Sequence, residues 1–174
     1  MRFIGIGILI MMFTSCNEEV NKVKPDLNWT KDNSTNLNKE LAIQEEIDIN
    51  LFLEMHKDWK LIKTGSGLQY YVYQKGVVDT VYSPRPGNIA EIEYEIRLLD
   101  GTLCDKTEDD EYVDFKVDRS DIESGVQEAI KLLKIDDRAK LIIPSHLGHG
   151  LIGDMNKIPP LTTLVIDIHL LGIK

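Results

Sequence analysis

The 174-residue sequence has few cysteines and few basic residues, and both shortages exclude classes of function. Only two cysteines occur, Cys16 and Cys104, so the chain is not a scaffold held together by disulfides. The 20 Lys and Arg residues are outnumbered by 29 Asp and Glu residues, which gives a formal net charge of −9 at pH 7. This charge would repel a nucleic acid, so we expect no nucleic-acid partner.

The sequence also lacks the common motifs of hydrolases, transferases and nucleotide-binding enzymes. It contains no Gly-x-Ser-x-Gly motif, no P-loop and no Gly-x-Gly-x-x-Gly after a strand-like segment. His146 and His149 could bind zinc together with Cys104, but the two histidines lie in an irregular segment and no further ligand lies nearby in the sequence. We therefore predict that both histidines pack or form hydrogen bonds within a loop, and we expect neither a metal ion nor a cofactor.

Long hydrophobic runs are missing as well, and the N-terminal apolar stretch, residues 3–13, is too short to cross a bilayer as a helix. The stretch follows Arg2 and ends at Phe13-Thr14-Ser15-Cys16, which is typical of a signal peptide. The last four residues resemble the lipobox of bacterial lipoproteins, with Phe13 where Leu is usual. This resemblance implies that the signal peptide, residues 1–15, is removed and that lipidated Cys16 anchors the protein in the bacterial envelope, with the outer membrane expected. An ordinary secretory signal and a retained short anchor are the alternatives.

The next segment, residues 16–38, is polar and has no helical stripe, so we predict a flexible tether. Within it, Asn17-Glu18-Glu19 is either an acidic part of the tether or, by resemblance, the signal that sends lipoproteins of Bacteroidetes-type bacteria to the cell surface. Residues 39–60 carry apolar side chains four positions apart, which predicts an amphipathic helix. The residues of this stripe are Ile43, Ile47, Leu51 and Met55, with Phe52 and Trp59 alongside. The stripe must pack either on the following domain or on a second copy of the chain, in a homodimer through residues 39–59.

The remainder of the chain, residues 64–174, has strand patterns around one short helix. Apolar and charged residues alternate over 90–98, which predicts a strand with one solvated face. Apolar residues at helical spacing over 126–133 predict a short helix with a buried face, and Ser124 with Gln127 offers a capping box. Other strand-like segments are 68–74, 115–117, 139–143 and 164–168. This order predicts an α+β fold in which the helix packs on one face of an antiparallel sheet.

The last two strand-like segments flank a loop of about 17 residues that is rich in Gly and Pro. The loop keeps apolar residues that are able to pack, so we expect it to be ordered and to cover a binding site.

Several motifs of residues 64–174 occur together in the order found in FKBP-type peptidyl-prolyl isomerases. From the N-terminus they are Thr64-Gly65-Ser66-Gly67-Leu68-Gln69-Tyr70, Leu99-Asp100-Gly101-Thr102-Leu103-Cys104-Asp105, Phe115-Lys116-Val117, Ala139-Lys140-Leu141-Ile142-Ile143-Pro144, Gly148-His149-Gly150, Ile158-Pro159-Pro160 and Leu164-Val165-Ile166-Asp167-Ile168. No motif is specific by itself, but the ordered combination is. Within the family the chain most resembles the gliding-motility-associated lipoproteins of Bacteroidetes, which share the stretch 144–151 and the lipobox.

The resemblance implies a strongly bent antiparallel sheet wrapped around a short helix, with a proline-binding pocket between helix and sheet. It implies catalytic roles for Tyr94, Asp105, Phe115 and His149. It implies substrate binding by Cys104, Ile122, Glu123, Val126, Ile158 and Ile166. Three of these positions, Cys104, Val126 and Ile166, carry large aromatics in archetypal members, and we expect the pocket to be shallower and the activity weaker for lack of them.

Two functions follow from the resemblance as hypotheses. The first is a peptidyl-prolyl cis-trans isomerase, anchored to the envelope, that assists folding at X–Pro segments of exported or envelope proteins. The second is a non-catalytic docking component of a gliding or secretion machine that keeps the fold alone.

Overall fold

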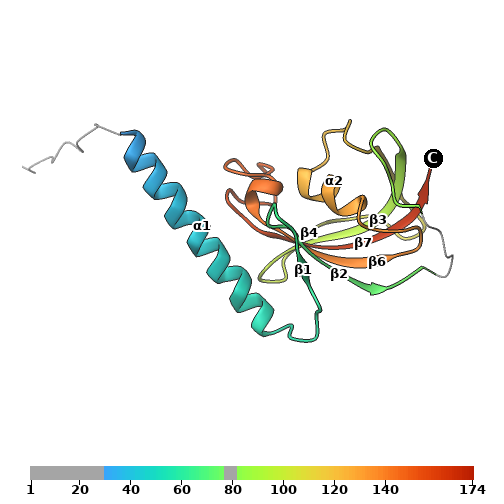
Figure 1. The fold of residues 1–174 in the computed structure, drawn as a ribbon, viewed down its shortest axis with the longest axis horizontal. Helices are drawn as coiled ribbons and strands as arrows, with labels where there is room; N and C mark the ends of the chain where they lie inside the picture. Colours follow the sequence, from blue (N-terminus) through green and yellow to red (C-terminus); the bar gives the residue numbers. More distant parts are fainter. Residues whose placement is uncertain (1–29, 77–81) are drawn as a thin grey trace, which may run out of the picture.

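The computed structural model describes residues 30–76 and 82–174, and within them it has an α+β fold (Figure 1). The α+β class predicted from the sequence is confirmed. The elements in chain order are α1 (Lys31–Glu54), β1 (Ile62–Lys63), β2 (Gln69–Gln74), β3 (Ile89–Leu98), β4 (Leu103–Lys106), β5 (Val113–Lys116), α2 (Ser124–Ile130), β6 (Arg138–Ile143), the 3₁₀ helix η1 (Ser145–Leu147) and β7 (Leu164–Ile173).

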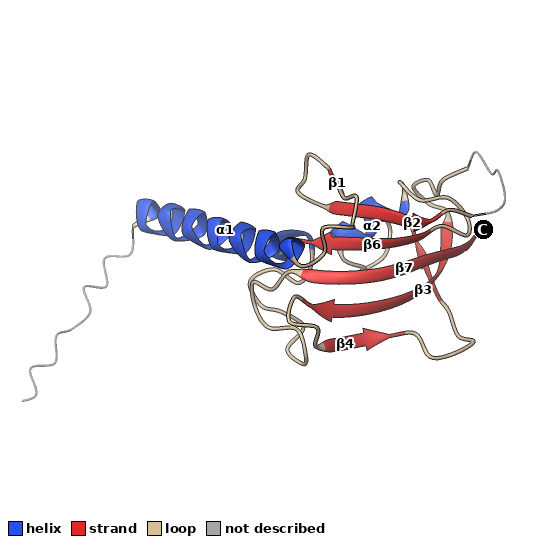
Figure 2. Ribbon diagram, turned by 90° about the horizontal axis from the view of Figure 1, so that it is seen from below, coloured by secondary structure: helices blue, strands red, loops and turns tan. Residues whose placement is uncertain are grey.

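The strands form one antiparallel sheet with the order β1-β2-β6-β7-β3-β4, and β5 also pairs with β3 (Figure 2). The longest pairing joins β3 to β7, from Ala90 opposite Ile173 to Leu98 opposite Leu164. The predicted alternation on β3 is confirmed, because Ala90, Ile92 and Ile96 are buried. These two long strands form the centre of the sheet and position the site described below.

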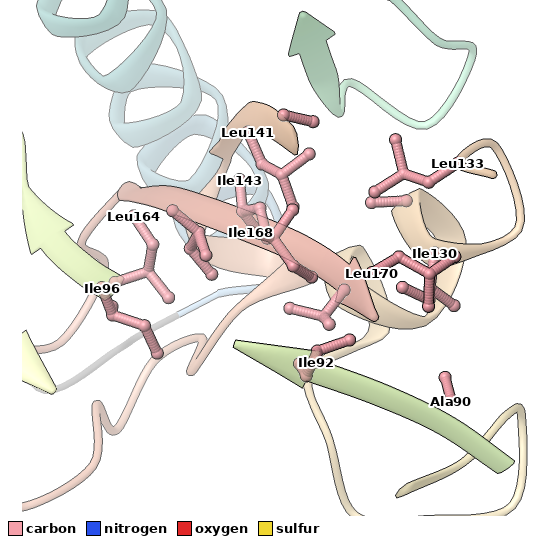
Figure 3. Close-up of a cluster of buried hydrophobic side chains, with 14 of the residues drawn as sticks. Ala90, Ile92, Ile96, Ile130, Leu133, Leu141, Ile143, Leu164, Ile168 and Leu170 are labelled. Carbon is pink, nitrogen blue, oxygen red and sulfur yellow. The ribbon is translucent and has the colours of Figure 1, made fainter. Parts of the chain in front are cut away.

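The main core lies between α2 and the face of the sheet that it covers. Ile130 at the end of α2 and Leu133 just after it point toward side chains of β6 and β7, among them Leu141, Ile168 and Leu170 (Figure 3). All five of these side chains are fully buried. Burying one Leu or Ile side chain stabilises a fold by about 1.5–3 kcal/mol, so this cluster dominates the stability of the domain.

The capping box predicted for α2 does not form. Glu123 occupies the N-cap position without a side-chain hydrogen bond to the helix. The Ser124 hydroxyl instead donates to the Leu147 carbonyl (3.2 Å), and the buried Gln127 side chain accepts from the backbone N–H of Asp118 (2.8 Å). These side chains attach neighbouring loops to α2, which leaves them unable to cap its own N-terminus.

Helix α1 differs in extent from the predicted helix. It begins at Lys31, inside the segment predicted as tether, because Thr30 caps it by accepting a hydrogen bond from the backbone N–H of Asn33 (3.3 Å). It ends at Glu54 rather than at residue 60. The rest of the predicted tether, including Cys16, and the whole of the predicted signal peptide lie outside the described residues.

The i, i+4 stripe predicted on α1 remains largely exposed. Ile43, Ile47, Leu51 and Met55 are 46–73% exposed. Helix α1 instead buries Ile49 and Phe52 against Ile142 and Val165, on the face of the sheet opposite α2. Of the apolar residues predicted on this helix, Phe52 therefore packs on the sheet, whereas the i, i+4 stripe stays exposed. Across residues 30–76 and 82–174, no helix has the length and apolar character needed to cross a membrane.

Candidate functional site

A cavity of about 240 Å³ lies between α2 and the sheet. Its lining residues are Ile92, Tyr94, Ile96, Asp105, Val113, Ile122, Glu123, Val126, Ile166 and Ile168. The structure therefore brings together six of the ten candidate residues derived from the sequence. Those six are Tyr94, Asp105, Ile122, Glu123, Val126 and Ile166. Apart from Tyr94 and the two carboxylates, the wall is aliphatic.

One end of the cavity is polar and is formed by neighbouring strands. The hydroxyl of Tyr94 on β3 donates to Asp105 Oδ2 on β4 at 2.7 Å. Burial raises the pKa of Tyr94 to about 12, and the hydrogen bond and negative charge of Asp105 add to the effect, with a smaller contribution from Glu123. The Tyr94 hydroxyl therefore stays protonated well above neutral pH and keeps donating its hydrogen bond to Asp105.

A second polar contact closes the rim where α2 begins. His149 Nε2 lies 2.8 Å from Glu123 Oε1, and both side chains are mostly buried. His149 belongs to the segment 144–163 between β6 and β7, which we call the lid. The pair ties the lid to the start of α2, so His149 lies at the rim and does not line the cavity.

Three further candidates lie in the core around the cavity instead of on its wall. Cys104, Phe115 and Ile158 are only 4–5% exposed and belong to the main core. Cys104 lies on β4, Phe115 on β5 and Ile158 in the lid, and all three side chains pack into the main core. We expected these three residues and His149 to line the pocket, but none of the four lines this cavity.

Cys104 has a structural contact with the lid. Its Sγ lies 3.9 Å from the carbonyl oxygen of Lys157, and the Lys157 ammonium donates to the Cys104 carbonyl (2.8 Å). Burial raises the pKa of the Cys104 thiol, so the nucleophilic thiolate is disfavoured.

Four lining residues were not among the candidates derived from the sequence. Ile92, Ile96 and Ile168 lie two residues from Tyr94 or Ile166 on the same strand, so the period-two pattern of β3 and β7 placed them on the same face. Val113 lies two residues from the candidate Phe115 on β5, but the strand expected from the sequence began only at residue 115.

The two lid histidines have separate partners. His146 Nε2 lies 2.9 Å from the carbonyl oxygen of Ser66, while His149 contacts Glu123. His146 thus forms a predicted hydrogen bond, but both histidines contact residues outside the lid and not partners within it. Within the described part of the chain, no group of three or more His, Cys, Asp and Glu side chains is arranged to hold a metal ion.

Comparisons with known proteins agree on the kind of domain. Residues 81–171, just over half of the chain, match the family described as "FKBP-type peptidyl-prolyl cis-trans isomerase". The chain is 33% identical over 117 residues to "FKBP-type peptidyl-prolyl cis-trans isomerase FkpA" of Escherichia coli, an alignment that covers 66% of this chain and 41% of that protein. It is 28% identical over 168 residues to "Outer membrane protein MIP" of Legionella longbeachae, covering 95% of this chain and 69% of the relative.

The crystal structure of E. coli FkpA has a similar fold, with a TM-score of 0.65 and 27% identity. The superposition covers 82% of this chain and 64% of that one. The sequence alignment spans less than half of the E. coli relative, 41% of its length, and the superposition spans 64% of the crystal structure's chain.

Proposed function

Because the chain belongs to the FKBP-type peptidyl-prolyl cis-trans isomerase family, we propose that the 240 Å³ cavity binds a proline ring and catalyses the isomerisation of X–Pro bonds. The observation that supports this proposal most directly is the composition of the wall. Seven aliphatic side chains surround a space of side-chain size, with a hydroxyl–carboxylate pair at one end. Such a site accepts an apolar ring attached to a polar amide.

The reaction needs no nucleophile in this proposal. The barrier to X–Pro rotation, about 18–20 kcal/mol, comes from amide resonance, which is lost at the twisted transition state. A planar amide has the larger dipole and loses more hydration when it enters an apolar site. The cavity therefore stabilises the twisted amide relative to the planar one, which is catalysis by differential binding.

The chain's residues have distinct roles in this mechanism. Ile122, Val126 and Ile166 contact the proline ring, and the backbone N–H of Glu123 holds a peptide carbonyl of the substrate. Asp105 orients the Tyr94 hydroxyl at the polar end, where it fixes the amide edge. His149 acts on the rim through Glu123, and no cofactor takes part.

The proposed site of action is the bacterial envelope, where exported or envelope proteins with X–Pro segments are the substrates. Three observations support this location: the signal-like segment 1–15, the lipobox cysteine Cys16, and the similarity to a Legionella protein named as an outer membrane protein. The membrane attachment is a lipid anchor in this proposal. The stretch 144–151 and the lipobox support assignment to the gliding-motility-associated lipoproteins.

The test is a refolding assay in which a cis-proline peptide bond limits the rate, run with the full chain. We expect wild type to accelerate refolding and Asp105→Ala to lower kcat/KM by about tenfold, because losing the hydrogen-bonded partner of Tyr94 costs about 1–2 kcal/mol. Asp109→Ala, an exposed carboxylate in the loop after β4, is the matched control and should leave the rate unchanged.

The alternative function predicts a different result in the same assay. A non-catalytic docking component of a gliding or secretion machine would leave refolding at the rate measured without protein. That outcome would remove the isomerase proposal and leave the fold assignment intact.

A further inference from the structure

A second and larger hollow lies between α1 and the lid, with a volume of about 640 Å³. Figure 1 shows α1 running beside the lid, which is drawn in orange and red between β6 and β7. We call this hollow the α1 groove. Its apolar lining residues are Leu41, Ala42, Leu98, Leu99, Leu151 and Leu161. Leu41 and Ala42 come from α1, and the others from the end of β3 and from the lid.

Hydrogen bonds from α1 hold the groove in shape. The carboxylate of Glu45 accepts from the backbone N–H of Ser145 (2.6 Å), from the Ser145 hydroxyl (3.1 Å) and from the Thr163 hydroxyl (2.7 Å). Ser145 and Thr163 are buried and lie at the two ends of the lid. One side chain of α1 therefore holds both ends of the lid in place. The position of α1 relative to the lid, and with it the shape of the groove, is fixed by these hydrogen bonds.

The groove lies near one end of the proline cavity along the two central strands, on the side of the sheet that carries α1. Ile96 on β3 and Ile166 on β7 line the cavity, whereas Leu98 and Thr163, two and three residues further along, line the groove. At about 3.3 Å per residue, the two sites are separated by roughly 7–10 Å along the strands. A polypeptide with its proline in the cavity would have to pass from the α2 side of the sheet to the α1 side to reach the groove.

The charge of the groove indicates what kind of segment it accepts. Its lining includes Glu45, Asp48 and Asp100 but no Lys or Arg. A hydrogen bond from the Thr102 backbone N–H lowers the pKa of Asp100, so this carboxylate is ionised at neutral pH. An apolar segment with a neighbouring cation is complementary to such a lining.

We propose that the α1 groove binds an apolar stretch bearing Lys or Arg, on the same client polypeptide whose proline occupies the cavity. This proposal rests on the proposed isomerase function and adds a substrate class to it: unfolded, basic-apolar chains in preference to short X–Pro peptides. A second copy of the chain is a poorer occupant, because the exposed apolar stripe at Ile43 and Ile47 faces away from the groove side of α1.

The first experiment compares two substrates of the full chain: a four-residue X–Pro peptide, which fills only the cavity, and an unfolded protein in a proline-limited refolding assay. Leu41→Ser and Leu151→Ser should lower kcat/KM for the protein by about tenfold, since the loss of one buried Leu contact is worth about 1.5 kcal/mol. The same variants should change kcat/KM for the short peptide by less than about twofold. Ile47→Ser, on the exposed stripe of α1, is the matched control and should alter neither value.

The second experiment measures binding without catalysis. Two fluorescein-labelled, proline-free dodecapeptides contain three leucines flanked by either two lysines or two glutamates, and anisotropy reports their Kd. We expect the lysine peptide to bind at least about tenfold more tightly, and Asp48→Asn to reduce this preference, whereas Glu46→Gln, which lies outside the groove lining, leaves it unchanged.

The outcomes separate this proposal from the proposed function. Equal losses on both substrates for Leu41→Ser and Leu151→Ser, or equal binding of the two dodecapeptides, would overturn the groove proposal while isomerase activity stands. Failure of wild type to isomerise the short peptide would overturn the proposed function itself, and with it the substrate class inferred here.

Discussion

Tyr94 illustrates how a single residue of the candidate site makes stability depend on pH. Its pKa is raised to about 12 by burial and by the hydrogen bond to Asp105, against 10 for an ordinary tyrosine. Tyr73, which donates to Asp167 at 2.8 Å, is raised to about 12 for the same reasons. A raised pKa in the folded state means that folding favours the protonated phenol.

The expected consequence is a loss of stability in alkaline solution. Below pH 10 both tyrosines are protonated in the folded and in the unfolded chain, so they do not make the free energy of unfolding depend on pH. Between pH 10 and 12 only the unfolded chain ionises, and the free energy of unfolding falls. Urea titrations at pH 8 to 12 measure this fall, and Tyr94→Phe should make it shallower. An identical slope in wild type and Tyr94→Phe would contradict the stated role of burial and Asp105.

At the scale of single residues, the sequence predicted which side chains surround the cavity better than it predicted their contacts. The resemblance implied that Tyr94, Asp105 and Val126 line one pocket, and all three line the cavity. This worked because a shared fold brings the same motif positions together. The contact between His149 and Glu123 was not predictable, since the two residues lie 26 positions apart and meet only when the lid folds over α2.

Among the elements, α1 and the lid are linked by one carboxylate. Glu45→Ala leaves the buried Ser145 N–H and Thr163 hydroxyl without their acceptor, which should lower the free energy of unfolding by about 1–3 kcal/mol. The measurement is urea denaturation of the full chain. Glu46→Ala is the matched control, because Glu46 forms only an exposed ion pair with Lys63 and should cost less than about 1 kcal/mol. Equal midpoints for the two variants would show that Glu45 does not hold the lid.

The same helix shows the limit of periodicity as a guide to packing. The repeat of Ile43, Ile47 and Leu51, with Phe52 alongside, correctly predicted a helix but left open whether its apolar face packs on the domain or on a second copy. Phe52 packs on the sheet together with Ile49, and this contact depends on the complementary surface of Ile142 and Val165 about 90 or more residues later. The α2 capping box failed for a related reason, since Ser124 has a better partner in the lid. Local patterns specify elements, whereas contacts between elements depend on the whole arrangement.

For the molecule as a whole, the exposed stripe of α1 predicts self-association. Opposite the face packed on the sheet, Ile43, Ile47, Leu51 and Met55 remain 46–73% exposed, which is costly for a helix surrounded by water. We expect the full chain to be a homodimer through residues 39–59 and Ile47→Ser with Leu51→Ser to be monomeric. Light scattering measures the mass, and Ile62→Ser, an exposed apolar residue on β1, is the control. A monomeric wild type at all concentrations tested would remove this prediction.

Attachment to the membrane is a second property of the whole molecule. Cys16→Ser should move the protein from the membrane fraction to the soluble fraction in bacterial cells, because lipidation requires the thiol. Cys104→Ser, at the other cysteine, should leave the protein in the membrane fraction. Persistent membrane attachment of Cys16→Ser would favour an uncleaved N-terminal anchor over the lipobox.

The length of α1 has a consequence for where the enzyme works. A helix of 24 residues is about 36 Å long, and in both views its C-terminal end lies on the sheet while its N-terminal end extends away from the domain (Figures 1 and 2). If the chain is anchored at Cys16, this helix acts as a stiff spacer with a defined reach. The cavity would then sample a shell at a set height above the lipid, where emerging chains are still extended, and would seldom meet proline segments lying at the bilayer surface itself.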